Sequence, residues 1–255
     1  MPKFDIYKFR WALITGASSG IGSEFAVQLA QKGLNVILIG RNSEALSSVA
    51  DKIHSISNVS VVMLQADLTK ELNSTLVNLS RFNIDLLVNN AGFGLYGDFL
   101  TYSWNEYENM IKLNIEVLTR LSYHYAKEFS KRGSGGIINV SSVAGFMPIP
   151  HFSVYAATKA FVYSFSLSLW AELKDKNVHV LCVAPGKTRT KFFERAKMSP
   201  GNNLMSPEKV VKGALKAFEK DAPLYIPGLG NKLSYYVVRK MFSDKLISKI
   251  LVKYF

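Results

Sequence analysis

The chain of 255 residues is long enough for one large α/β domain or, alternatively, two small ones. A hydrophobic content of 48% supports a substantial core and excludes a largely disordered protein. The formal net charge of +12 would attract nucleic acid, anionic lipid or phosphorylated ligands, or would simply keep a soluble protein monodisperse.

Cysteine and histidine usage points away from disulfides and metal sites. The one cysteine, Cys182, lies in an apolar run and leaves no partner for an intrachain disulfide, which fits a reducing compartment. The four histidines show no metal-ligand spacing, so we expect no metal. The first residues lack the apolar core of a signal peptide, and no run of about 18 uncharged apolar residues occurs. We therefore expect a cytoplasmic protein without a transmembrane helix.

Short apolar runs alternate with longer amphipathic ones along the whole chain. The predicted strands are 11–15, 35–39, 59–64, 86–89, 136–140, 178–184 and 224–226. The predicted helices are 20–32, 43–54, 69–80, 103–130, 153–174 and 207–220. This alternation predicts an α/β fold with a doubly wound parallel sheet, whose ligand lies at the carboxyl ends of the strands.

A glycine-rich turn follows the first predicted strand and opens the first helix. Its pattern is Gly16-x-x-x-Gly20-x-Gly22, which would let backbone N–H groups approach a pyrophosphate. The spacing differs from G-x-G-x-x-G, and Ser23 stands where a P-loop needs lysine. The pattern therefore indicates a dinucleotide site, with an ordinary glycine-rich turn as the alternative.

The ends of the next strands also carry candidate cofactor contacts. Arg41 follows the second strand, where an acidic residue would accept hydrogen bonds from the ribose of NAD. A guanidinium pairs with a 2′-phosphate instead, so Arg41 favours NADP(H), unless it is only a solvated side chain. Asp67 is predicted either to bind the adenine amino group or to cap the next helix. The run 89–92, Asn-Asn-Ala-Gly, would shape the cofactor cleft or form a plain turn.

A candidate catalytic group consists of Asn114, Ser142, Tyr155 and Lys159. Tyr155 and Lys159 lie four residues apart, so a helix places them on one face. An ammonium beside a phenol favours the phenolate and lowers a pKa that is ordinarily about 10. Such a tyrosine serves in acid–base chemistry near neutral pH. Taken alone the pair would be a common surface pair, but with Ser142 at the end of a strand and a dinucleotide turn it indicates carbonyl–alcohol chemistry.

In this order and approximate spacing, the motifs resemble the short-chain dehydrogenase/reductase family from Thr15 through Thr190. The resemblance implies one Rossmann-type domain with about seven parallel strands. It implies that Tyr155 is the general acid/base and that Lys159 lowers its pKa while holding the nicotinamide ribose. It further implies that Ser142 binds the substrate oxygen and that Asn114 holds a water in a proton relay.

Together, the motifs and the resemblance predict a site that prefers NADP(H) over NAD(H). The predicted contacts are Gly16, Ser18, Ser19, Gly20, Ile21, Gly22, Arg41, Asp67, Leu68, Asn90, Ala91, Gly92, Tyr155, Lys159, Pro185, Gly186, Thr188 and Thr190. Thr188 departs from the valine or isoleucine that is frequent in the family, but its backbone would keep the contact. The continuation Phe93-Gly94 is similar to a poorly characterised bacterial branch, distantly similar to 3-ketoacyl-CoA reductases and hydroxysteroid dehydrogenases.

We therefore expect an NADP(H)-dependent oxidoreductase that interconverts a carbonyl and an alcohol on a hydrophobic small molecule. The alternatives are a 3-oxoacyl thioester or hydroxysteroid reductase at a membrane surface, and a non-catalytic NADP(H)-binding sensor. The candidate substrate pocket consists of Phe93, Tyr96, Phe146, Met147, Phe152, Phe192 and Phe193.

Two segments of the single domain 1–255 carry further predictions. The irregular residues 187–206 are predicted to form a substrate loop or lid. The basic amphipathic residues 229–255 would lie on a membrane surface, on their own domain or on a second subunit of a dimer or tetramer. No nucleic-acid-binding module is recognisable, so we expect no nucleic-acid partner.

Overall fold

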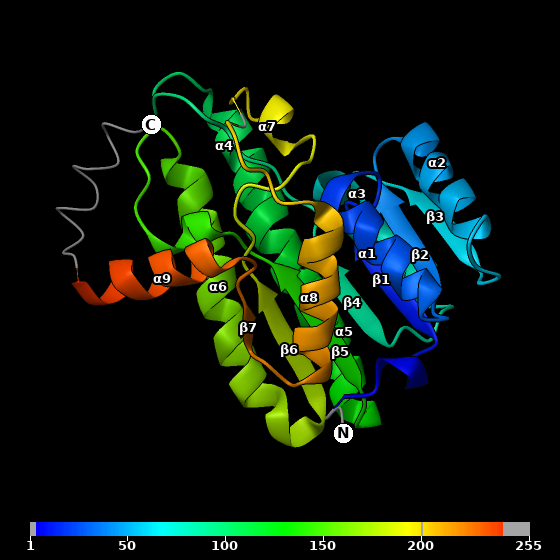
Figure 1. Ribbon diagram of the computed structural model, residues 1–255. Coiled ribbons are helices and arrows are strands. Elements are labelled where there is room, and N and C mark those ends of the chain that lie inside the picture. Colours follow the sequence, from blue (N-terminus) through cyan, green and yellow to red (C-terminus); the bar gives the residue numbers. More distant parts are fainter. Residues whose placement is uncertain (1–3, 200, 242–255) are drawn as a thin grey trace.

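A parallel sheet forms the centre of the computed structural model, which describes residues 4–199 and 201–241 (Figure 1). Within these residues seven strands pair in the order β3-β2-β1-β4-β5-β6-β7. Their bounds are β1 Trp11–Thr15, β2 Asn35–Gly40, β3 Val61–Gln65, β4 Leu86–Asn89, β5 Gly135–Val140, β6 Val178–Val183 and β7 Leu224–Tyr225. From β1 the strand order runs outward to β3, and the chain then returns to add β4 on the other side of β1. Doubly wound folds bind ligands at the point where the strand order reverses in this way, here between β1 and β4. The predicted fold class is confirmed.

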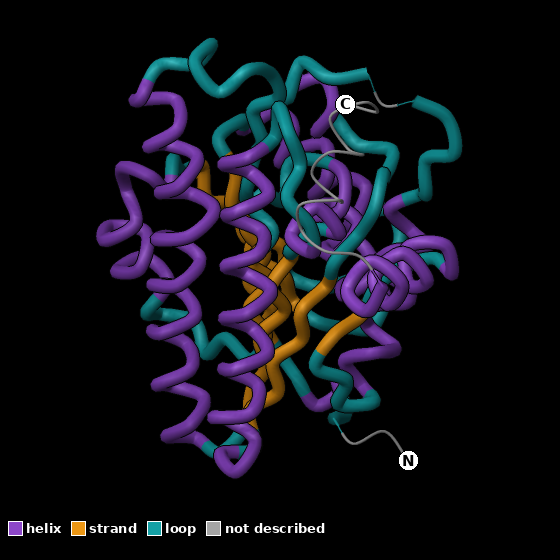
Figure 2. Tube along the Cα trace, turned by 90° about the vertical axis from the view of Figure 1, so that its left-hand side faces the viewer, coloured by secondary structure: helices purple, strands orange, loops and turns teal. Residues whose placement is uncertain are grey.

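Helices cover both faces of this sheet (Figure 2). Their bounds are α1 Gly20–Gln31, α2 Ser43–His54, α3 Leu68–Leu79, α4 Trp104–Ile111, α5 Leu118–Arg132, α6 Ser153–Leu173, α7 Phe192–Arg195, α8 Pro207–Glu219 and α9 Leu229–Met241. Short helical turns are η1 Ile6–Lys8, η2 Lys112–Val117, η3 Val143–Phe146 and η4 Lys174–Lys176. One apolar core joins the sheet to α1, α2 and α8, and another joins it to α3, α5 and α6.

Strand β1 shows why the strands read as continuous apolar runs. Ala12 and Ile14 belong to the core beneath α1, α2 and α8, whereas Leu13 belongs to the opposite core. Successive side chains of a strand point to opposite faces, so a sheet covered on both sides buries every residue. All three side chains are fully buried.

The prediction of one helix over 103–130 is wrong in detail. Glu106 bonds the backbone N–H and hydroxyl of Ser103 in a capping box that starts α4. The helical path then passes through the π-helix η2 before α5 begins. A π-helix inserts a wider turn and changes which face the following side chains occupy. Asn114 lies within this wider turn, at the candidate site.

A polar chain crosses the otherwise apolar interior. Asn89 on β4 donates hydrogen bonds to Asn139 on β5 at 2.9 Å and to Ser122 on α5 at 3.0 Å. Asn139 in turn donates to Ser166 on α6 at 3.0 Å. All four side chains are buried. The two central strands are therefore hydrogen-bonded through side chains to the two helices that carry or follow the candidate catalytic residues.

The two segments singled out in the sequence follow β6 and β7 along the chain. Thr188 and Met205 pair as an isolated bridge, and α7 lies between them. Helix α9 follows β7 and places Tyr235 against Phe146, with ring centroids 4.5 Å apart, and against Tyr163, whose hydroxyl is 2.9 Å away. Residues 242–255 of the predicted C-terminal segment lie outside the described residues. None of the helices described is both long and apolar enough to cross a membrane.

Candidate active site

The glycine-rich turn connects β1 to α1 and is hydrogen-bonded to the end of β4. The backbone N–H groups of Asn90 and Ala91 both donate to the Thr15 hydroxyl at 3.0 Å. The Asn90 amide donates to the carbonyl oxygens of Thr15 at 3.0 Å and Gly16 at 3.2 Å. Asn90 is therefore more than a turn residue, because it joins the segment after β4 to the turn after β1.

Gly20 begins α1 with a φ of +63°, a conformation that few other residues adopt. A Cβ atom at this position would lie 2.8 Å from a methyl carbon of Thr190, so the turn packs against the segment after β6. Ser19 occupies the N-cap position without a side-chain capping bond, and Ile21 and Gly22 form the first turn. Backbone N–H groups at such a helix N-terminus bind phosphate.

Ser18, Arg41 and Asp67 follow β1, β2 and β3, respectively. Asp67 caps α3, accepting bonds from the Thr69 N–H at 3.0 Å and hydroxyl at 2.7 Å. Burial acts to raise the pKa of Asp67, but the Thr69 bonds and the charges of Arg41 and Lys70 hold it below its usual value. The capping alternative is thus observed, and the adenine contact stays a prediction. The Arg41 side chain is exposed. Ser18 lies beside Gly40, the residue that precedes Arg41.

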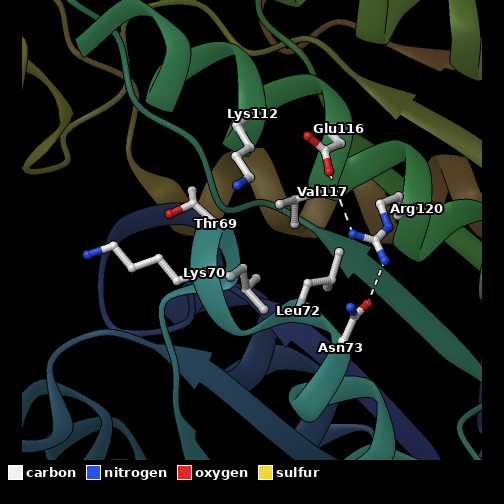
Figure 3. Close-up of a pocket in the computed structure, with 9 residues that line it drawn as sticks. Thr69, Lys70, Leu72, Asn73, Lys112, Glu116, Val117 and Arg120 are labelled. Carbon is white, nitrogen blue, oxygen red and sulfur yellow. Dashed lines mark hydrogen bonds and ion pairs between the residues drawn. The ribbon is translucent and has the colours of Figure 1, made fainter. Parts of the chain in front are cut away.

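A pocket of about 190 Å³ lies between α3, η2 and α5 (Figure 3). It is lined by Leu68, Thr69, Lys70, Leu72, Asn73, Lys112, Glu116, Val117 and Arg120. Arg120 is held by Asn73 at 2.6 Å and by Glu116 at 3.6 Å. The pocket includes Leu68, a predicted cofactor contact next to the predicted adenine contact Asp67, and none of the predicted catalytic residues. It therefore adjoins the predicted adenosine end of the site and not the reacting end.

The four candidate catalytic residues come from three elements and meet beyond the ends of β4 and β5. Ser142 is the N-cap of η3, Asn114 lies in η2, and Tyr155 and Lys159 lie in the first two turns of α6. Tyr155 shares a side-chain hydrogen bond with Ser142. Lys159 donates to the Val140 carbonyl at 2.9 Å, and its Nζ is 5.8 Å from the centroid of the Tyr155 ring.

Burial dominates the electrostatics of this group. It raises the pKa of Tyr155 well above its ordinary value, and the hydrogen bond with Ser142 only partly opposes this. It lowers the pKa of Lys159 to about 8. The pKa of Tyr155 is thus raised, opposite to the predicted lowering, and the effect of Lys159 on Tyr155 during the reaction stays a prediction. The cation is close to the ring, but removing the phenol from water has the larger effect.

Asn114 has more hydrogen bonds than the sequence suggested. Its amide donates to the Phe93 carbonyl at 2.9 Å and to the Thr158 hydroxyl at 3.1 Å, and its oxygen accepts from the Phe93 N–H at 3.2 Å. Thr158 also donates to the Tyr155 carbonyl at 2.7 Å. The Asn114 side chain thus joins the segment after β4 to α6. Sequence reasoning missed Thr158, although its place between Tyr155 and Lys159 was a usable signal.

The residues after β6 complete the rim. The Val143 N–H donates to the Pro185 carbonyl at 3.1 Å, which places Pro185 beside the Ser142 segment. Thr188 is buried, and its hydroxyl donates to the Gly186 carbonyl at 3.0 Å. The threonine that stands here in place of valine or isoleucine therefore has a hydrogen-bond partner for its hydroxyl. Gly186 lies against Asn231 of α9.

Five of the seven candidate pocket residues cluster around Tyr155: Phe93, Tyr96, Met147, Phe152 and Phe192. Phe146 instead packs against Tyr163 and Tyr235, and Phe193 is buried, with its ring edge-on to Phe192. Five of the seven predicted pocket residues therefore belong to the cluster of Tyr155, and Phe146 and Phe193 do not.

Comparison with known proteins gives the family of the chain. Residues 10–200 match the sequence profile of the family described as short chain dehydrogenase. The chain belongs to the short-chain dehydrogenase family. It is 36% identical over 180 residues to 17-beta-hydroxysteroid dehydrogenase type 3 of Mus musculus, covering 69% of this chain and 59% of that protein. The chain thus spans less than two thirds of that relative's length.

Two other proteins are similar to this chain over more of their length. The very-long-chain 3-oxoacyl-CoA reductase of Bos taurus is 35% identical over 222 residues, covering 81% of this chain and 67% of that protein. A short-chain dehydrogenase from Sphingobium yanoikuyae, solved in complex with NADPH, is 35% identical with a TM-score of 0.85. That match covers 90% of this chain and 92% of the other.

Proposed function

We propose that this protein is an NADP(H)-dependent oxidoreductase that interconverts a carbonyl and an alcohol on a hydrophobic substrate. The observation that carries the proposal is the gathering of Asn114, Ser142, Tyr155 and Lys159 beside the glycine-rich turn. A non-catalytic sensor is the second candidate, but all four side chains that the chemistry needs are present, which favours the enzyme.

The residues fit a nicotinamide dinucleotide. The turn from Gly16 to Gly22 would hold the pyrophosphate, and Asp67 with Leu68 would hold the adenine. Arg41 would pair with a 2′-phosphate, because it stands exposed at the end of β2, where a carboxylate would repel one. The NADPH bound by the Sphingobium relative supports the same preference. When bound, the cofactor supplies the hydride.

The protein's own residues supply the proton and hold the oxygen. In reduction, the Tyr155 hydroxyl donates a proton to the substrate oxygen while negative charge develops there. Ser142 donates a hydrogen bond to that oxygen and stabilises the charge. Lys159 is protonated below about pH 8 and would hold the nicotinamide ribose, and its charge would favour ionised Tyr155 when the reaction runs toward the ketone. Asn114 positions both α6 and the segment that follows β4. The helical turn that contains Asn114 would hold the relay water.

The substrate class follows from the aromatic residues around Tyr155. Phe93, Phe152 and Phe192 present rings and no charge, which suits an apolar ketone or acyl chain. The relatives named for hydroxysteroids and for 3-oxoacyl-CoA act on bulky apolar carbonyl compounds of these two kinds. We include 3-oxoacyl thioesters and hydroxysteroids among the candidate substrates for this reason.

NADPH oxidation by the full chain, screened over ketones, aldehydes and 3-oxoacyl thioesters, tests the proposal. Tyr155→Phe should keep NADPH binding, followed by nucleotide fluorescence, and lose about 10²–10⁴-fold in turnover. Tyr123→Phe, at an exposed tyrosine of α5, is the matched control and should leave turnover unchanged. A fully active Tyr155→Phe enzyme would contradict the assignment. NADPH binding without turnover of any carbonyl would favour the sensor.

We further propose a cytoplasmic homo-oligomer, a dimer or tetramer, that makes peripheral contact with membranes through α9. Leu229, Leu233 and Tyr236 are spaced by four and three residues, share one helix face and are exposed. Tyr235 and Asn231 contact the body of the domain. With Lys232 on the same helix and the positive net charge of the chain, this face suits an anionic lipid surface.

A further inference from the structure

The ring of Tyr155 is covered by two phenylalanine rings. Phe152, just before α6, stacks on it with centroids 4.4 Å apart and planes 28° apart. Phe192, the first residue of α7, lies 5.2 Å from it at 46°. Phe152 and Phe192 also touch each other edge-on, at 6.3 Å. As a result Tyr155 is only 6% exposed.

The loop after β4 closes the remaining side of this aromatic group. A Cβ atom at Gly94 would lie 2.8 Å from the tip of the Phe152 ring and 3.0 Å from the tip of the Phe192 ring. The Gly94 backbone is therefore already in contact with both rings, and a side chain here would push them apart. Three segments far apart in the sequence, at residues 94, 152 and 192, thus meet over one tyrosine.

Phe192 is the more exposed of the two phenylalanine residues that cover Tyr155. Both carbonyls accept a helical bond at 2.9 Å, Phe152 from the Ala156 N–H at the start of the long helix α6 and Phe192 from the Ala196 N–H. Phe192 begins the four-residue helix α7, and its N–H donates to the Thr190 hydroxyl at 3.2 Å. The Phe192 side chain is also partly exposed, whereas Phe152 is buried. Rotation of the Phe192 side chain would take one of the two covering rings off Tyr155 without moving α6.

We propose that Phe192 is a gate and a specificity-determining residue of this enzyme. Tyr155 is only 6% exposed while both rings cover it, so a ring must move before a carbonyl oxygen can touch the Tyr155 hydroxyl and receive its proton. The Phe192 ring therefore leaves Tyr155 when substrate enters, and its bulk then limits the size of the group beside the carbonyl. This inference rests on the proposed function for its catalytic consequence, but the covering of Tyr155 by Phe192 is testable without substrate.

Nitration of tyrosines by tetranitromethane, mapped by mass spectrometry on the cofactor-free full chain, tests the gate directly. The exposed Tyr7 and Tyr123 report the intrinsic rate, and the buried Tyr125 reports whether the fold is intact. In the wild-type protein Tyr155 should react far more slowly than Tyr7. Phe192→Ala should raise the Tyr155 rate at least about fivefold while Tyr125 stays unreacted. If Tyr125 also reacts, Phe192→Leu, which keeps more volume, replaces the alanine variant.

The matched control is Phe161→Ala, which removes a partly exposed ring from α6 away from Tyr155 and should leave the Tyr155 rate unchanged. With NADPH, Phe192→Ala should raise kcat/KM for a bulky ketone relative to a small one by about tenfold, a typical effect of pocket size. Equal nitration of Tyr155 in the Phe192→Ala and wild-type proteins, or an unchanged substrate ratio, would overturn the gate. A wild-type protein that reduces no carbonyl would overturn the proposed function and leave the nitration result to decide on the covering of Tyr155.

Discussion

The variant Asn114→Ala distinguishes a structural role of the Asn114 side chain from a role in proton transfer. The side chain makes three hydrogen bonds and is 1% exposed. Each such bond contributes about 0.5–1.5 kcal/mol net, so losing all three should cost about 3 kcal/mol of unfolding free energy. For a chain of this size each kcal/mol lowers Tm by about 2–4 °C, which gives an expected loss of about 6–12 °C.

The assay is thermal unfolding followed by circular dichroism, with turnover measured on the same preparations. Asn109→Ala is the matched control, because its amide makes one exposed bond to the Asn105 carbonyl on α4. It should shift the unfolding free energy by no more than about 0.5 kcal/mol. If Asn114→Ala kept the wild-type Tm and lost only turnover, the hydrogen bonds to Phe93 and Thr158 would have no structural weight. The side chain would then act in the chemistry alone.

Three further changes test the cofactor end, the buried lysine and α9. Arg41→Asp should shift the NADPH-to-NADH preference by roughly 10–100-fold, because a bond to a charged phosphate is lost, and Arg81→Asp should not. Burial lowers the pKa of Lys159 to about 8, so the unfolded chain binds more protons above that pH. The free energy of urea unfolding should therefore rise between about pH 8 and 10, and Lys159→Met should flatten this rise. Leu233→Glu should reduce co-sedimentation with anionic vesicles relative to Val77→Glu on α3. Equal binding by both variants would end the membrane proposal.

The order and type of the elements could be predicted from the apolar pattern. A strand that is buried on both faces is a short continuous apolar run, whereas a helix that is buried on one face has an apolar stripe with a period of about 3.6 residues. The ends of elements were less accessible. The third strand was expected at 59–64 but is Val61–Gln65. The Asn35 side chain accepts from the Ser60 N–H at 2.9 Å, so ladder pairing with β2 begins one residue later. A side-chain bond of this kind is not visible in a hydrophobic pattern.

The candidate site was predictable by residue type but not by environment. Spacing placed Tyr155 and Lys159 on one helix face, and the structure brings both to the same place. The direction of the Tyr155 pKa shift was missed because it depends on Phe152 and Phe192, which approach from other segments. The π-helix around Asn114 was missed for a related reason. Its wider turn is stabilised by the contacts of Asn114 with Phe93 and Thr158, and not by a local propensity.

The side-chain chain through Asn89, Asn139, Ser122 and Ser166 has a consequence for engineering. Hydrogen bonds between amide and hydroxyl groups in an apolar interior require one relative position of the strands and helices that carry them. Aliphatic side chains in the same places would tolerate small shifts of these elements. The distance between the helix after Asn114 and the helix of Tyr155 is thus set deep within the molecule, below the reacting groups. A chimaera that combines α5 or α6 with strands lacking Asn89 and Asn139 should keep its fold. It should lose the alignment of the two helices on which turnover depends.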